Sequence, residues 1–256
     1  MKYLFLRVFV IVFALAAAAN SQTEPGRLAI DLNKQGVAQY ANGDYAKAIE
    51  SFNRALELSP KSPAIYINLG HALRQVHDLD RAEADFRHAL VLQPDNGFTH
   101  NQLGVVLRES NRHVEALAEF RAAAVLRPNN AVIMLNIGNA LIAIKDFKGA
   151  SEILEQAKQI GGDNPAIRMS LGYAYAMRKK TDQAIAEVRE AVRIDPRDQD
   201  AQYFLGNLYA AKGDKEAAME QQRKIRTVNP ELAQRLFAAI NSDKIVVVNP
   251  DTIGFR

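Results

Sequence analysis

A glycine that recurs every 34 residues constrains the fold of this chain more than any other feature of its sequence. The recurring residues are Gly36, Gly70, Gly104, Gly138, Gly172 and Gly206. A fixed period of ~20–50 residues is typical of solenoids, in which each repeat is one small structural unit stacked on the next. We therefore divide residues 29–232 into six repeats and number each so that its recurring glycine occupies position 8. The six repeats are 29–62, 63–96, 97–130, 131–164, 165–198 and 199–232.

Other positions recur in register with the glycine. Position 7 is leucine or isoleucine in every repeat except the first, which has Gln35, and position 20 is always alanine. Position 24 is bulky and position 27 is alanine in the first five repeats, and position 32 is proline in all but the fourth. This spacing predicts two amphipathic helices per repeat. An aspartate at position 16 is expected to cap the second helix, and proline at position 32 to end it. The four aspartates are Asp44, Asp78, Asp146 and Asp214.

This set of residues resembles the tetratricopeptide repeat family over residues 29–232. The resemblance implies an all-α fold, a right-handed superhelical α-solenoid of antiparallel helix pairs. It also implies that the first helices line the concave face and the second helices the convex face.

The sixth repeat departs from the pattern, because Gln222 and Ile225 replace the usual residues at positions 24 and 27. A terminal repeat needs a cover with a polar outer side. We expect residues 230–242 to form this capping helix, with Leu232, Leu236, Phe237 and Ile240 on one face. Residues 243–256 form a C-terminal tail, for which two interpretations remain: an unstructured end, or a strand that adds to a partner's sheet edge.

The first 19 residues have the order of a secretory signal peptide. Lys2 and Arg7 precede an unbroken apolar run at residues 8–19, which ends in three alanines. Cleavage is expected after Ala19 or Ser21, and residues 20–28 then form a linker. The alternative is an uncleaved anchor in the inner membrane, although the apolar segment is shorter than the ~20 residues that span a bilayer. The leader and the short body of repeats are typical of bacterial exported proteins, so the periplasm or the medium is the expected location.

The sequence contains no motif for catalysis or for a cofactor. It lacks the phosphate-binding, dinucleotide-binding, nucleophile-elbow and zinc-protease motifs, and it has no cysteine. The five histidines occupy different repeat positions, so we do not expect them to converge on a metal ion. The formal net charge is only +3, and the sequence has no basic stripe interleaved with aromatic residues. Both features argue against nucleic-acid binding. We therefore expect neither an enzyme nor a cofactor.

A partner-binding surface is expected where the repeat constrains the sequence least, at positions 2, 5, 6, 9, 12 and 13 of the first helices. Amides at position 6 resemble the asparagine ladder with which superhelical members of the family hold a peptide backbone, although such amides are also common in the family without that role. Apolar side chains at positions 5, 9, 12 and 13 of the last three repeats suggest an exposed docking groove, unless they pack on each other or on the next repeat. The predicted partner-contacting residues are Asn68, Gln102, Leu135, Asn136, Asn139, Ile142, Met169, Tyr173, Met177, Tyr203 and Asn207.

The sequence thus favours a non-enzymatic adaptor that binds a peptide or a partner's helix in the concave groove. The alternative is a structural assembly factor of a cell-envelope complex that docks through its cap or tail. The resemblance to family members that bind chaperones is incomplete, because those members place lysine at position 5 and none of the six repeats does.

Overall fold

The computed structural model describes residues 24–242, which form thirteen α-helices and no strand. These residues divide into two compact units, one ending at Arg127 and the other beginning at Pro128. The first unit contains α1 (Glu24–Ala41), α2 (Tyr45–Leu58), α3 (Pro63–Gln75), α4 (Leu79–Leu92), α5 (Gly97–Glu109) and α6 (His113–Leu126). The second contains α7 (Ala131–Ala143), α8 (Phe147–Ile160), α9 (Pro165–Met177), α10 (Thr181–Ile194), α11 (Gln199–Lys212), α12 (Lys215–Arg226) and α13 (Pro230–Asn241).

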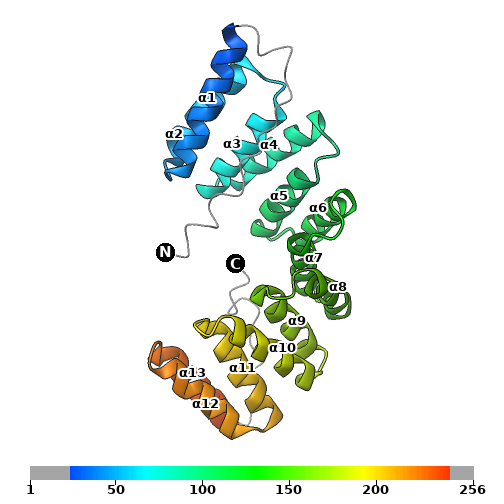
Figure 1. Ribbon diagram of the computed structural model, residues 1–256, viewed down its shortest axis with the longest axis vertical. Coiled ribbons are helices and arrows are strands. Elements are labelled where there is room, and N and C mark those ends of the chain that lie inside the picture. The colour runs from blue at the N-terminus through cyan, green and yellow to red at the C-terminus, as the bar shows by residue number, and fades with distance from the viewer. Residues whose placement is uncertain (1–23, 243–256) are drawn as a thin grey trace. The chain divides into compact units, whose positions relative to one another are not determined.

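Within each unit, consecutive helices pack as pairs and each pair packs on the next (Figure 1). In the first unit α1 pairs with α2, α3 with α4 and α5 with α6, while α2 contacts α3 and α4 contacts α5. In the second unit α7 pairs with α8, α9 with α10 and α11 with α12, and α13 packs on both α11 and α12. The predicted all-α solenoid of helix pairs is therefore confirmed.

The recurring glycine makes this pairing close. A Cβ atom built on Gly104 would lie 2.6 Å from the Phe120 ring, and one on Gly138 would lie 2.5 Å from Leu154. Both partners are the position-24 side chains of the paired second helix, and both are completely buried. The same contact joins Gly36 to Phe52, Gly70 to Phe86 and Gly172 to Val188. A side chain at position 8 would push the two helices of each pair apart.

The last pair obtains this contact from a different helix. Position 24 of the sixth repeat is Gln222, and the atoms nearest to a Cβ on Gly206 belong instead to Leu236 of α13, at 2.5 Å. Leu236 and Ile240 are buried, so α13 covers the end of the array with two of the side chains expected to do so. Phe237 was expected on the same face, but it is 47% exposed, because it follows Leu236 directly and therefore points about 100° away around the helix.

All six turns inside the repeats share one backbone conformation. Position 15 has a positive φ in every repeat, with values of 84° at Gly43 and 87° at Gly213. The other four are non-glycine residues with φ between 59° and 65°, namely His77, Asn111, Lys145 and Lys179. In each turn the backbone amide of position 16 donates a hydrogen bond to the carbonyl oxygen five residues earlier, as from Asp78 to Leu73 at 3.0 Å. This hydrogen bond stabilises a backbone conformation that L-residues rarely adopt.

Three of the four predicted aspartate caps are confirmed. The carboxylates of Asp78, Asp146 and Asp214 accept hydrogen bonds from backbone amides in the first turn of α4, α8 and α12. The prediction for Asp44 is wrong, because its side chain makes no capping bond and instead lies 3.5 Å from the ammonium group of Lys47.

None of the helices between residues 24 and 242 combines the length and the hydropathy that crossing a membrane requires. The predicted signal peptide at residues 1–19 and the tail at 243–256 lie outside the described residues.

We predict that Gly172→Ala will destabilise the second unit by about 1–3 kcal/mol, because the added methyl group would lie 2.5 Å from Val188. Gly162→Ala is the matched control, since the nearest atom to its added methyl group is 3.4 Å away. Thermal and urea unfolding should show a lower stability for Gly172→Ala and little change in stability for Gly162→Ala. Equal stability of the two variants would contradict the close-contact interpretation.

Candidate functional site

The first-helix face is the side of the first helices that carries positions 5, 9 and 12, with position 6 beside it. These positions are neighbours on a helix surface because they are three or four residues apart. In the first unit the face belongs to α1, α3 and α5, and in the second unit to α7, α9 and α11. We consider the two faces separately.

The apolar groove predicted in the second unit is less exposed than expected. Met169 and Tyr203 are each 6% exposed, Ile142 is 4% exposed and Tyr173 is 2% exposed. The Tyr173 ring lies 6.3 Å from the ring of Phe147 and 6.2 Å from that of Phe204, measured between centroids. The prediction that these four side chains are exposed is therefore wrong. Large side chains on neighbouring first helices are close enough to pack on one another.

The position-6 amides also differ from a ladder aimed at a ligand. The Asn68 side-chain amide donates to the side-chain oxygen of Asn33, 3.0 Å away on α1. In the second unit the Ser170 hydroxyl donates to the side-chain oxygen of Asn139 at 2.7 Å, which links α9 to α7. These polar groups therefore join consecutive first helices.

The remaining predicted residues are divided between the interior and the surface. Asn136 and Asn207 are buried, and the Asn207 side-chain amide donates to the Tyr203 carbonyl oxygen at 2.9 Å. The predicted residues that keep partial exposure are Gln102, Leu135, Asn139 and Met177. Their role in binding stays a prediction, and they are the side chains that a ligand could reach without repacking the core.

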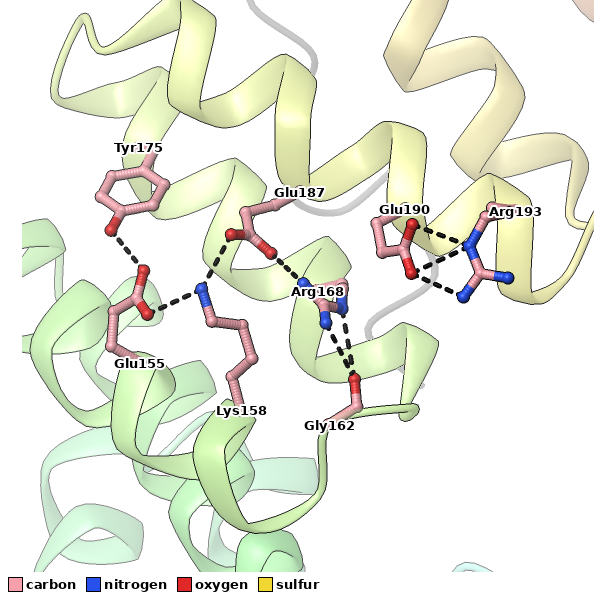
Figure 2. A network of polar contacts seen from close by, with 8 residues as sticks. All are labelled: Glu155, Lys158, Gly162, Arg168, Tyr175, Glu187, Glu190 and Arg193. Carbon is pink, nitrogen blue, oxygen red and sulfur yellow. Dashed lines mark hydrogen bonds and ion pairs between the residues drawn. The ribbon is translucent and has the colours of Figure 1, made fainter.

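A network of charged side chains lies between α8, α9 and α10 in the second unit (Figure 2). The Glu187 carboxylate bridges the Lys158 ammonium and the Arg168 guanidinium, with both distances 2.8 Å. Lys158 also pairs with Glu155 at 2.7 Å, and the Tyr175 hydroxyl donates to the other oxygen of Glu155. Arg168 donates further to the Gly162 carbonyl oxygen. The network thus links helices of adjacent repeats.

The charges in this network satisfy one another. Burial raises the pKa of Tyr175, and its hydrogen bond to Glu155 raises it further, so the hydroxyl stays protonated. Burial alone would raise the pKa of Glu155, but the hydrogen bonds from Lys158 and Tyr175 outweigh it and lower that pKa. This arrangement is that of a structural ion-pair network.

The histidines do not meet at one point. Within residues 24–242, no three histidine, aspartate or glutamate side chains are placed to hold a metal ion. His88 stacks on Tyr66 with ring centroids 5.1 Å apart, and His100 lies 2.7 Å from a carboxylate oxygen of Glu119.

The first-helix face of the first unit contains a group of cationic and polar residues that sequence reasoning missed. Arg74 and Arg108 occupy position 12 of α3 and α5, and His71 lies one turn before Arg74. His71 is 4% exposed, and burial followed by the charge of Arg74 lowers its pKa to about 3, so the ring is neutral. Its Nε2 atom and the Nε atom of Arg74 are both buried without a hydrogen-bond partner. Position 12 is arginine in α3 and α5 but apolar in the second unit, and this difference is the sequence signal that could have identified the group.

Comparisons with known proteins agree with the fold. Tetratricopeptide repeat models match residues 36–77, 107–172, 67–131 and 180–233, which together cover most of the chain. No curated protein matches the chain significantly in sequence.

Several solved structures are similar to the chain. PilW, described as a widely conserved type IV pilus biogenesis factor, has a TM-score of 0.75 and 20% identity, covering 82% of this chain and 99% of its own. Pseudomonas aeruginosa pilF has a TM-score of 0.72 and 17% identity, covering 84% and 99%. YrrB, described as a TPR protein with an unusual peptide-binding site, has a TM-score of 0.62 and 26% identity, covering 74% and 99%.

We predict that Glu187→Gln will destabilise the second unit by about 1–3 kcal/mol, because it leaves two partly buried cations without their shared carboxylate. Glu190→Gln, on the same helix, is the matched control. The partner of Glu190 is Arg193, whose side chain is 68% exposed, so the loss of this ion pair should change the stability little. The comparison requires urea unfolding of both variants, and equal losses would contradict a structural role for the buried network.

Proposed function

Because the chain belongs to the tetratricopeptide repeat family, whose repeats bind proteins or peptides, we propose that it is a non-enzymatic adaptor. In this proposal each first-helix face binds an extended peptide or a helix of a partner protein.

One observation carries the proposal: the sequence varies on this face, whereas the positions that pack the two helices of each pair change little. Positions 8 and 20 keep the same small residue in all six repeats. Position 12, in contrast, is partly exposed in every repeat but the fourth, and it changes from tyrosine and arginine in the first unit to isoleucine and alanine in the second. A packing role would favour one residue type at equivalent positions, whereas recognition of a non-repeating ligand favours different ones. The partly exposed Gln102, Leu135 and Met177 are the side chains we assign to contact with the ligand.

The chemistry of the chain supports a binding function better than a catalytic one. The ionisable groups between α8, α9 and α10 form a network of mutually satisfied ion pairs. Members of the family are generally scaffolds. The similarity to YrrB, described as having a peptide-binding site, is consistent with a peptide ligand.

A second function, assembly of an envelope complex through the C-terminal cap, is favoured by a specific observation. Phe237 is 47% exposed on α13 and Val228 is 66% exposed just before this helix. Exposed apolar side chains near the end of a solenoid suit a docking surface. The fold similarity to PilW, described as a pilus biogenesis factor, motivates this alternative. Either function is proposed to operate outside the cytoplasm, in a bacterial periplasm or beyond, on the basis of the leader sequence.

Site-specific photo-crosslinking separates the two functions. A photoreactive phenylalanine at Gln102, Leu135 or Met177 should form adducts with a partner in cells. The photoreactive phenylalanine placed at Val91 or Val125 is the matched control, because both positions are exposed on second helices. Adducts from the Phe237 position alone would support the assembly function, and adducts from the second-helix positions alone would contradict both functions.

We predict that the exported protein begins at Asn20 or Gln22, because cleavage after Ala19 or Ser21 removes the apolar leader. Intact mass spectrometry of the periplasmic fraction from a Gram-negative host measures this directly. Recovery of the uncleaved chain in the membrane fraction would instead support the anchored alternative.

A further inference from the structure

Two arginines on the first-helix face of the first unit share a single carboxylate. The Arg74 guanidinium lies 3.3 Å from a carboxylate oxygen of Glu109, on the neighbouring first helix. Arg108 is adjacent to Glu109 in sequence, yet its guanidinium forms no ion pair or hydrogen bond with a carboxylate anywhere in residues 24–242. Glu109 can neutralise only one of the two arginines, so a positive charge remains at this point.

This unneutralised charge is partly removed from water. The Arg74 and Glu109 side chains are 24% and 32% exposed, and Arg108 is half-buried. Burial lowers the pKa of Arg108, the charge of the neighbouring Glu109 offsets this in part, and the charge of Arg74 lowers the pKa again. A cation in such surroundings is destabilised relative to water unless an anion pairs with it.

Unused hydrogen-bonding groups accompany the charge. The Nε–H group of Arg74 and the Nε2 atom of His71, one turn away on α3, are both buried without a hydrogen-bond partner. Buried polar atoms of this kind usually have a partner, so this part of the face is not fully satisfied within the chain. The His71 ring packs against Phe86 and Phe98, at 5.3 and 5.8 Å between centroids, which holds it in place.

The repeat architecture does not require arginine at these positions. In the second unit, position 12 is Ile142, Ala176 and Ala210. The same helix pairs therefore form with apolar residues at position 12. The arginines of the first unit add a feature that the scaffold itself does not need.

From this geometry we infer that Arg74 and Arg108 form a binding site for an acidic side chain of a bound peptide. This inference rests on the proposed peptide-binding function and specifies its ligand. An aspartate or glutamate of the ligand would pair with the partly exposed Arg108 guanidinium, beside the ion pair of Arg74 with Glu109. Charge-assisted hydrogen bonds to a guanidinium are among the strongest polar contacts in proteins. This pair of arginines at position 12 differs from a carboxylate-binding site built on lysine at position 5, because none of the six repeats has lysine at that position.

The test uses the full-length chain and a pool of short random peptides, all acetylated at the N-terminus and amidated at the C-terminus. Because every end is blocked, a preference for acid can arise only from side chains. Bound peptides are recovered, sequenced and compared with the input pool. The expected result is an enrichment of aspartate or glutamate over asparagine and glutamine of roughly tenfold to a hundredfold at one peptide position.

Arg108→Gln should remove this enrichment while peptides without acidic residues still bind. Arg108→Lys retains the positive charge but lacks the planar guanidinium group, so it should retain a weaker enrichment. This variant keeps the test valid if the glutamine variant unfolds. Arg121→Gln is the matched control, because Arg121 is exposed on the second helix α6 and lies outside the inferred site. The control should leave the enrichment unchanged.

The possible failures are distinguishable. If no peptide from a pool with blocked or free C-termini binds to the wild-type chain, the proposed function fails together with the inference. If peptides bind without preference for acid, or if Arg108→Gln retains the preference, the function stands and the inference is overturned. A parallel pool with free C-termini identifies the source of the carboxylate, and binding that occurs only in that pool would overturn the assignment to a side chain.

Discussion

The structure depends on one contact that is repeated along the chain, between a glycine on the first helix of each pair and a bulky side chain on the second. A Cβ atom at Gly138 would lie 2.5 Å from Leu154, well inside van der Waals contact. The close approach buries the small and bulky residues of each repeat completely, including Phe86 and Phe120. The same requirement explains α13: the sixth repeat has Gln222 at this position, and Leu236 fills the space over Gly206 instead.

Because this contact specifies the helix pair, the outer positions of the first helices are free to differ, and the two units use them differently. In the second unit the first-helix face is occupied by large apolar side chains and by hydrogen bonds between neighbouring helices, such as the one from Ser170 to Asn139. In the first unit the face has two arginines with one carboxylate, and buried nitrogen atoms without partners. The first arrangement is chemically satisfied, whereas the second lacks an anion. The proposed ligand specificity therefore depends most on the first unit.

The periodic features of the fold could be predicted from the sequence because each follows from local chemistry repeated at a fixed spacing. Helix pairing follows from small residues at positions 8 and 20, and the caps at Asp78, Asp146 and Asp214 follow from a side chain and its own helix. The same reasoning fails at Asp44, where the carboxylate lies near Lys47 rather than the backbone amides of the helix. It also gives no signal for the positive φ of Lys145 and Lys179, since lysine does not favour that conformation.

The site was harder to predict because exposure depends on the neighbouring repeat. Met169 and Tyr173 lie on one stripe of α9, and the stripe itself could be derived from the sequence. Their burial could not be derived in this way, since burial depends on which residues of the neighbouring helices lie on both sides of α9. Asn68 could likewise be placed on the first-helix face, but its hydrogen bond to Asn33 joins residues 35 apart. The unneutralised charge at Arg108 is a three-dimensional property of the same kind, because it depends on which arginine Glu109 contacts.

The most direct test of the central claim, that the first-helix faces bind peptide, is a crystal structure of the full-length chain with the tightest-binding peptide from a random pool. The account predicts a peptide that lies along α1, α3 and α5 or along α7, α9 and α11, in contact with positions 5, 9 and 12. A peptide bound to the second helices or to α13, with the first-helix faces empty, would contradict it.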